Sequence, residues 1–474
     1  MAKDDRGCRE FEASTWSRRD LLTVGALSGM GLALPELLRA REEGPRPSAK
    51  RIESSTFGRA RSVIVLYLHG GHPQHETWDP KPDAPAEVRG DFKDIATSVP
   101  GTRFCELFPM AASLADKFTV IRSLTHNNSN HVQASMPAMT GHSHPAGTES
   151  QGDIPPSSTD FPPFGAVLDH LRSRGDIPVH LRKDNLPTWV QVGPLMRRAN
   201  GTVLHGQRPG FLGPEHSAFA VNEDLLSLDV KVQAVTPQLP VLRMRARQSL
   251  LAQVDSQQRA LGAAAETENL DHYYQRAFQI LTSPATANAF RLAEEPHAMR
   301  EQYGMTQFGQ SCLLARRLAE ASVPMVNVHF CHKPRGSWDT HRENSKRMRK
   351  LAPNLDRPFT ALVTDLEQRG LLDETLVVAT AEFGRTPTIN QYGGRDHWPW
   401  VYSVAFAGAG TRPGVVYGSS DRLAAYPNTH PHDPRDFAAT LYHLLGVPRG
   451  TTISDGEEAR PVVIGEKIDA VLAG

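Results

Sequence analysis

This 474-residue chain has few cysteines and no surplus charge of either sign. The four cysteines, Cys8, Cys105, Cys312 and Cys331, are spaced neither as a CxxC metal knuckle nor as a disulfide framework. Lysine plus arginine total 52 and aspartate plus glutamate also total 52, so the formal net charge is zero. This balance argues against the basic surface that nucleic-acid-binding proteins carry, and we expect no nucleic-acid partner.

Long hydrophobic runs are also scarce. The one near the N-terminus, residues 21–34, follows Arg18 and Arg19 and is interrupted by Gly25, Gly29 and Gly31. A membrane-spanning helix needs about 20 apolar residues, so this run is too short to be one. Residues 1–45 instead resemble a twin-arginine signal peptide and leader, and 46–60 a polar linker. We expect export by the twin-arginine machinery to the periplasm, the cell surface or the medium, with the leader either removed or retained. We expect no transmembrane segment in the body.

Three common catalytic motifs are missing: a GxSxG elbow, a Walker loop, and a GxGxxG after a predicted strand. Their absence argues against a serine hydrolase, a P-loop nucleotide hydrolase and a dinucleotide-dependent enzyme. The HGG at 69–71 is similar to the oxyanion loop of esterases, but no elbow serine accompanies it. Histidine, by contrast, is plentiful: there are 20, and many lie in short polar stretches rather than in apolar runs.

Five apolar runs predict buried β-strands, at residues 62–71, 118–124, 323–330, 375–381 and 402–408. Runs that are apolar on both faces are typical of central strands in a parallel sheet. Segments with helical spacing lie between them, and another closes the chain at 433–448. This alternation predicts an α/β fold with a mainly parallel sheet and helices on both faces. We expect one domain over 61–470, with a helical stretch near 240–300.

Polar clusters follow four of the predicted strands. Their acidic and imidazole side chains are His69, Glu76 and Asp79 after the first strand, His131 after the second, Asp339 and His341 after the third, and Glu382, Asp396 and His397 after the fourth. Parallel strands end at one edge of a sheet, so these clusters can converge. Carboxylate oxygens and imidazole nitrogens bind ions such as Zn²⁺ or Mn²⁺, and several together can hold one or two ions.

Each of these residues alone has an ordinary explanation. A lone surface histidine is usually solvated, and an aspartate at a strand end often caps the next helix. Taken together, Asp339, His341, Glu382 and His397 favour a metal site. The ordinary explanation is preferred for the other loop histidines, among them His72, His75, His142 and His144.

Four segments carry a family resemblance: GGHPQHETWDPKPDAPAEVRGDFKDI, PGTRFCELFPMAASLADKFTVIRSLTH, SWDTHREN and LLDETLVVATAEFGRTPTINQYGGRDHWP. They are similar to the alkaline phosphatase and sulfatase-like superfamily and, more closely, to an exported family in it, the family of unknown function 1501. The resemblance covers nearly everything after about residue 60. It implies the three-layer α/β sandwich of that superfamily.

The resemblance also implies metal ligands. SWDTHREN resembles the segment that gives Asp339 and His341 to one ion, and His397 resembles the later histidine that completes this first site. Glu382 takes the place of an acidic ligand of a second ion, whereas Phe383 replaces the histidine that relatives have next to it. The second site is therefore altered, and its further candidate ligands are His69, Glu76, Asp79 and Asp396.

The usual hydroxyl nucleophile is missing as well. Thr140 and Gly141 resemble the end of the superfamily's nucleophile helix, which places His131 where relatives have serine, threonine or a modified cysteine. His131 is then a candidate nucleophile, metal ligand or substrate contact, and water activated by a metal ion is another candidate nucleophile. Arg385 and Arg395 are candidates for holding an anionic ester, although Arg385 fits equally well as the partner of a nearby carboxylate.

Two functions follow from the resemblance and the departures from it. The first is an exported, metal-dependent hydrolase of phosphate or sulfate esters, acting on a small-molecule or polysaccharide substrate with Zn²⁺ or Mn²⁺. The second is a non-catalytic cell-surface binding protein that keeps the fold and a metal ion.

Overall fold

The computed structural model describes residues 56–145, 152–176, 186–227, 230, 232, 283–331 and 337–473. The predicted signal peptide and most of the predicted linker lie outside these residues. The expected helical stretch near 240–300 also lies outside them as far as residue 282. Beyond that point the chain forms α10 (Pro284–Ala289) and α11 (His297–Tyr303).

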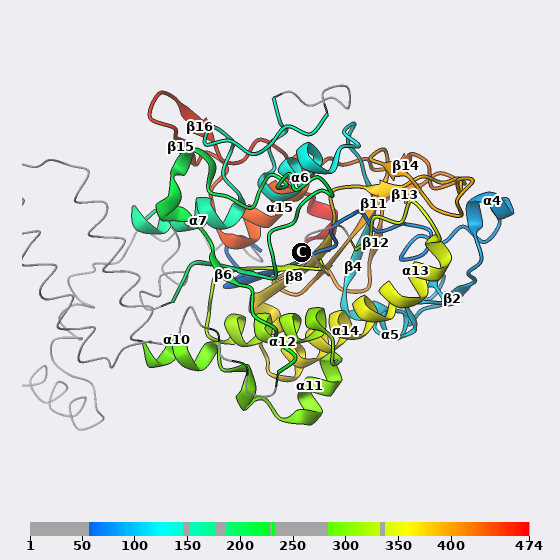
Figure 1. Ribbon diagram of the computed structural model, residues 1–474, viewed down its shortest axis with the longest axis horizontal. Coiled ribbons are helices and arrows are strands. Elements are labelled where there is room, and N and C mark those ends of the chain that lie inside the picture. The colour runs from blue at the N-terminus through cyan, green and yellow to red at the C-terminus, as the bar shows by residue number, and fades with distance from the viewer. Residues whose placement is uncertain are drawn as a thin grey trace, which may run out of the picture. The chain divides into compact units, whose positions relative to one another are not determined.

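A mixed eight-stranded sheet organises the described part of the chain (Figure 1). In sheet order the strands are β12 (Val416–Tyr417), β4 (Thr119–Leu124), β11 (Tyr402–Ala407), β8 (Thr375–Thr380), β1 (Ser62–Tyr67), β7 (Met325–His329), β5 (Trp189–Val192) and β6 (Phe219–Val221). Neighbouring strands are parallel, except that β11 is antiparallel to both β4 and β8. All five predicted strands are present. β5, β6 and β12 were not predicted, because runs this short show no periodic pattern.

Helices cover both faces of this sheet (Figure 1). Ile64 and Leu66 of β1 belong to a core cluster with α5 (Pro109–Ser113), α12 (Gln307–Glu320) and α14 (Pro353–Gln368). Val63 and Val65 point the other way, into a cluster with α6 (His131–Thr140), α7 (Phe164–Ser173) and α15 (Pro434–Leu445). Burial on both faces explains why the strand sequences are continuously apolar. The three layers confirm the predicted fold class.

Shorter elements surround the sheet. They are α4 (Ala86–Arg89), α13 (Asn344–Leu351) and four two-stranded ladders: β2 (Asp94–Ala96) with β3 (Arg103–Cys105), β9 (Gly384–Arg385) with β10 (His397–Trp398), β13 (Ser419–Ser420) with β14 (Pro427–Thr429), and β15 (Thr452–Ser454) with β16 (Ala459–Pro461). The β9–β10 ladder pairs His397 with Arg385, and it thereby returns a distant loop to the end of β8.

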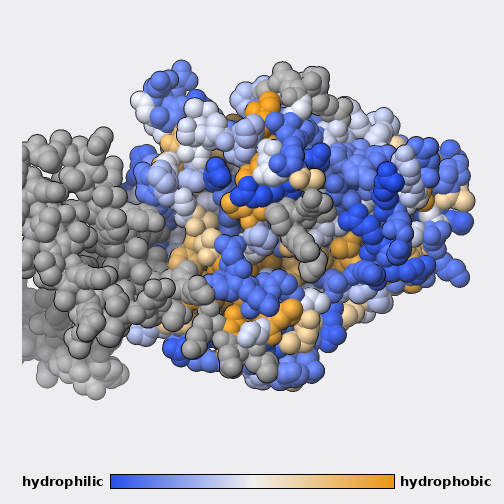
Figure 2. All heavy atoms as spheres, in the orientation of Figure 1, coloured by the Kyte–Doolittle hydropathy of each residue, from blue (hydrophilic) through white to orange (hydrophobic). Residues whose placement is uncertain are grey.

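The surface seen in Figure 2 is mostly hydrophilic, with small hydrophobic patches between polar residues. Among the described residues, no helix combines the length and the apolar character needed to cross a bilayer.

Candidate metal centre

The centre lies at the edge of the sheet where β1, β4, β7 and β8 end. These four strands run in the same direction, since β4 and β8 are both antiparallel to β11. His131 is the first residue of α6, the helix that follows β4. Its position is fixed by the preceding residue, Asn130, whose side chain caps the helix by accepting the Val132 N–H at 2.8 Å. Asp339 follows β7 and Glu382 follows β8.

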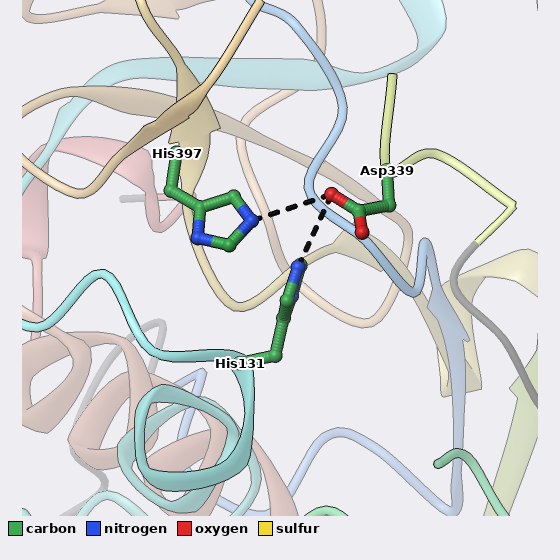
Figure 3. A group of neighbouring side chains, drawn as sticks. All are labelled: His131, Asp339 and His397. Atoms are coloured by element: carbon green, nitrogen blue, oxygen red, sulfur yellow. Dashed lines mark hydrogen bonds and ion pairs between the residues drawn. The ribbon is translucent and has the colours of Figure 1, made fainter. Parts of the chain in front are cut away.

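One carboxylate oxygen is the focus of the centre. Asp339 Oδ1 lies 3.3 Å from His131 Nε2, 3.3 Å from His397 Nε2 and 3.0 Å from His341 Nε2. His341 Nε2 is also 2.9 Å from His397 Nε2. Figure 3 shows His131 and His397 both directing a ring nitrogen at this oxygen. Four potential metal-ligand atoms, which come from three separate segments of the chain, therefore lie close to one another.

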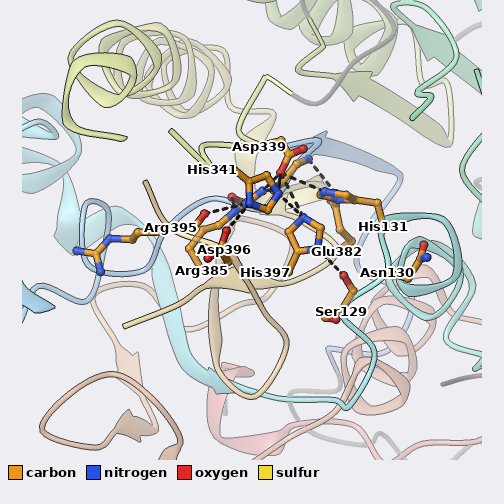
Figure 4. Close-up of polar contacts among 12 residues, drawn as sticks. Ser129, Asn130, His131, Asp339, His341, Glu382, Arg385, Arg395, Asp396 and His397 are labelled. Atoms are coloured by element: carbon orange, nitrogen blue, oxygen red, sulfur yellow. Dashed lines mark hydrogen bonds and ion pairs between the residues drawn. The ribbon is translucent and has the colours of Figure 1, made fainter. Parts of the chain in front are cut away.

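The opposite nitrogen of each ring is held by an acceptor (Figure 4). His131 Nδ1–H donates to Glu382 Oε1 at 2.5 Å, and His341 Nδ1–H donates to Asp396 Oδ1 at 2.6 Å. His397 Nδ1–H donates to the Ser129 carbonyl at 2.6 Å. A proton fixed on Nδ1 leaves the Nε2 lone pair free, and metal-binding histidines are almost always oriented in this way.

These donors fit a divalent metal ion. Bonds of about 2.0–2.1 Å in a tetrahedral site place neighbouring ligand atoms about 3.3 Å apart, close to the 2.9–3.3 Å distances around Asp339 Oδ1. His131 Nε2 is buried, and its 3.3 Å contact with Asp339 Oδ1 lacks the geometry of a hydrogen bond, as expected of an atom placed for an ion. The candidate donors of His131, Asp339 and His397 all lie within 4.8 Å of one another.

The protonation states of His397, Glu382 and Asp339 agree with this role, whereas contact with Asp339 raises the pKa of His341. Burial, together with the neighbouring His131, lowers the pKa of His397 to about 3, so the ring is neutral near pH 7. Burial would raise the pKa of Glu382, but the hydrogen bond and charge of His131 lower it to about 2. Burial likewise opposes ionisation of Asp339, whose pKa is nevertheless held well below its ordinary value by its close contacts with the three histidines and by the charge of Arg385. Ionised carboxylates and neutral imidazoles are the ligand forms that metals bind.

Phe383 forms an apolar wall of the centre. Its ring centroid lies 4.7 Å from that of His131 and 4.8 Å from that of His397, and the side chain is fully buried. Phe383 therefore packs against two of the candidate ligands and restricts their rotation.

The predicted second metal site is reorganised. Glu382 Oε1 is used by His131 and by the Gly70 N–H at 2.8 Å, and Asp396 orients His341, so both carboxylates support ligands. His69 is buried with its ring 6.1 Å from that of His131, but it does not belong to the group of His131, Asp339 and His397 whose donor atoms lie within 4.8 Å of one another. Glu382 Oε2 and His69 Nδ1 are buried without hydrogen-bond partners.

The structure corrects the predicted roles of Arg395, Glu76 and Asp79. Arg395 is fully buried and donates through Nε and Nη2 to Glu76 Oε1 at 2.9 and 2.6 Å. Figure 4 shows its guanidinium directed away from the histidines. Asp79 pairs with Lys81 at 2.9 Å and lies 3.5 Å from Arg122. Each of these buried charged side chains is paired with a side chain of opposite charge. None of the three is therefore available as a ligand or an anion contact at the centre.

Arg385 takes the second of its two predicted roles. It is fully buried, and its Nη2 donates to Asp339 Oδ1 at 2.6 Å and also to the Gly70 carbonyl. Its Nε and Nη1 donate to the carbonyls of Gly71 and Arg395, both at 3.1 Å. This arginine therefore fixes Asp339 and is not free to hold an ester.

Gly70 sets the position of Asp339. A Cβ at Gly70 would lie 2.3 Å from the Asp339 amide nitrogen, and the residue has φ of +113°. We expect Gly70→Ala to cost about 1–3 kcal/mol of stability from backbone strain and to weaken metal binding by displacing Asp339. Gly101→Ala is the matched control, because its φ is +79° with nothing within 4 Å of the added Cβ. Equal loss of metal binding in both variants would contradict this role.

The supporting carboxylates give a graded prediction. Glu382→Gln and Asp396→Asn should each weaken metal binding within the range of about 10–100-fold that is typical of residues that orient ligands. Glu382 should matter more, because it is completely buried whereas the Asp396 side chain is 51% exposed. Competition with a chromophoric chelator measures both affinities. Asp373→Asn, at an exposed aspartate, should leave the affinity unchanged.

The sheet thus carries a histidine- and carboxylate-rich group of side chains at the carboxyl ends of its strands. Residues 60–472 match the model of the protein family of unknown function DUF1501, and the chain belongs to this family. No curated protein matches the sequence.

Solved structures with a similar fold include three of low sequence identity. Ps i-CgsB is 13% identical, covering 85% of this chain and 74% of that one, with a TM-score of 0.39. The lipoteichoic acid synthase LtaP from Listeria monocytogenes is 9% identical (85% and 76% covered, TM-score 0.36). The phosphonate monoester hydrolase of Agrobacterium radiobacter is 12% identical (87% and 77% covered, TM-score 0.36).

Proposed function

We propose that this chain is a metal-dependent hydrolase of phosphate or sulfate esters, exported by the twin-arginine pathway. The observation that carries the proposal is the convergence of three Nε2 atoms on Asp339 Oδ1, with each Nδ1 held by an acceptor. Metal-binding histidines almost always donate their second ring N–H to a carboxylate, a backbone carbonyl or water in this way.

A divalent ion held by Asp339, His131, His341 and His397 would polarise an ester oxygen and lower the pKa of a water molecule. The chain's own residues define how a substrate reaches it. The His131 side chain is only 2% exposed, whereas His341 is 40% and Asp339 27% exposed. The centre is thus closed on the helix side and open on the His341 side, where an ester can approach.

A group of aromatic side chains includes Trp398, the residue that follows the candidate ligand His397. Trp398 lies in β10, and its ring centroid is 5.7 Å from that of Tyr426, which in turn is 6.4 Å from Trp400. Tyr426 and Trp400 are 51% and 40% exposed, unusually high for such large rings. Exposed rings such as these can supply an apolar surface for the organic part of an ester.

A non-catalytic binding protein is the second candidate, and the donor count favours it. Four protein ligands fill a tetrahedron, which is how structural zinc sites are closed, whereas catalytic zinc keeps one position open. An ion that prefers six ligands, such as Mn²⁺, would keep positions free at the same four donors. In addition, Arg385 and Arg395 are both occupied by protein partners. A bound ion with four ligands would therefore favour the binding protein, and one with six ligands would favour the hydrolase.

The test uses the full chain loaded separately with Zn²⁺ and with Mn²⁺. Each form is assayed on an aryl phosphate, an aryl phosphodiester and an aryl sulfate. We expect turnover of at least one ester, and we expect His397→Ala to remove it by more than the roughly 100-fold seen when only an orienting residue is lost. His297→Ala, at a histidine that is 64% exposed on α11, should retain full activity. No turnover with either ion would overturn the hydrolase and support the binding protein.

A further inference from the structure

A second group of side chains that could hold a metal ion lies beside α6. Donor atoms of His144, Asp160 and His205 are all within 4.8 Å of one another. His131 begins α6 at the first centre, whereas His144 follows the cap residue Gly141 at the far end. The two groups have no residue in common, and the donor atoms of each lie within 4.8 Å of one another, so they are separate candidate sites. The sequence pattern did not distinguish His144 from an ordinary surface histidine.

His205 is held in one orientation. Its backbone N–H donates to the Val132 carbonyl at 3.3 Å, and its carbonyl accepts from Ser135 Oγ at 3.1 Å, which ties the residue to α6. Its Nε2 lies 2.9 Å from the Ile154 carbonyl, an acceptor that requires the ring proton to be on Nε2. The Nδ1 atom of the neutral ring is therefore the one left as a ligand.

Asp160 is equally fixed. The Ser157 N–H donates to Oδ2 at 3.1 Å, and Ser157 Oγ donates to Oδ1 at 2.9 Å. Its carbonyl accepts the Phe211 N–H at 3.1 Å. These contacts orient Oδ2 at 2.6 Å from His205 Nδ1, and the ring of His144 lies 4.7 Å from that of His205.

Two acceptor atoms that face each other at 2.6 Å need a proton or a cation between them. We propose that His144, Asp160 and His205 form a second metal site, which binds Zn²⁺. Imidazole and carboxylate are suitable zinc ligands, and here both are already oriented by other contacts. Neighbouring ligands of zinc lie about 3.3 Å apart, so His205 Nδ1 and Asp160 Oδ2 need to separate by only about 0.7 Å.

The site opens on a cavity of about 420 Å³. His144 and Asp160 both line it, and so do the polar side chains of Ser143, Thr159 and Arg460. Three protein ligands with a fourth position facing solvent is the arrangement of catalytic zinc sites. The fourth ligand is then water or a small anion, for which Arg460 supplies the complementary charge.

The test disables the first centre by mutation and measures how much zinc the chain still binds. Full-length Asp339→Ala protein is dialysed against zinc chloride, and bound zinc is measured by mass spectrometry and by competition with a chromophoric chelator. We expect one zinc per chain in Asp339→Ala. In the same background, His144→Ala should lower its affinity by at least about 10-fold. His142→Ala is the matched control, because this histidine lines the same cavity but stacks on Phe161 and binds the Val462 carbonyl.

Asp160→Asn in the Asp339→Ala background is the second variant, since it keeps the size of the side chain while removing its charge. It should also weaken zinc binding. The proposal is overturned if Asp339→Ala binds no zinc, or if its zinc is unaffected by both His144→Ala and Asp160→Asn. Equal loss in His142→Ala would overturn the ligand set. None of these outcomes depends on hydrolytic activity, so the second metal site is tested independently of the proposed function.

Discussion

Replacing Asp339 with asparagine should remove the ion from the first centre and abolish the hydrolysis that depends on it. Asp339 Oδ1 is the atom on which His131, His341 and His397 converge, and it carries the only negative charge among these four donors. An amide oxygen of the same shape is neutral and binds a divalent ion much more weakly. We expect metal affinity to fall by more than the roughly 100-fold that orienting residues produce.

This variant should still fold. Arg385 keeps its hydrogen bonds to the carbonyls of Gly70, Gly71 and Arg395 when the aspartate charge is lost. Isothermal titration with Zn²⁺ and Mn²⁺ measures the affinity, and circular dichroism checks the fold. If Asp339→Asn folds normally and binds the ion as tightly as the unaltered chain, then Asp339 is not the central ligand.

Arg395→Met should be the most destabilising of the single substitutions at the charged residues near the centre. The variant leaves Glu76 as a buried, unpaired carboxylate, since the two side chains are 0% and 2% exposed. Removing one partner of a buried ion pair typically costs about 3–5 kcal/mol. The variant also deprives the carbonyls of Thr386, Pro387 and Val88 of their donor. Urea denaturation measures the loss.

The double variant Arg395→Met with Glu76→Gln separates this structural role from a role in substrate binding. Removing the stranded charge should recover part of the lost stability, so the double variant should be more stable than Arg395→Met alone. An Arg395 that held an ester would behave differently: Arg395→Met would unfold normally and only raise KM. That result would restore the anion-binding role.

The fold could be largely predicted because its signals are local. Continuous apolar runs gave β1, β4, β7, β8 and β11, and the helical spacing around them gave both outer layers. The missed strands have two to four residues each and pair through backbone groups that every sequence carries. The antiparallel direction of β11 was also not predicted, since an apolar run has no directional signal.

The candidate centre was predicted less completely, because the sequence identifies residue types but not their partners. Asp339, His341 and His397 are at the centre as expected from their positions after strands. Arg395 and Glu76 have the same residue types as a functional site, yet their partner is each other, which only the folded chain shows. The part played by Ser129 had no sequence signal at all, since any residue offers a backbone carbonyl.

Anomalous X-ray diffraction from crystals of the purified chain, collected at the zinc and manganese absorption edges, tests the first centre most directly. The account predicts a peak about 2.0–2.3 Å from Asp339 Oδ1 and from Nε2 of His131, His341 and His397. A chain that takes up neither ion, or an ion bound elsewhere while these four donors remain hydrogen-bonded to one another, would contradict it.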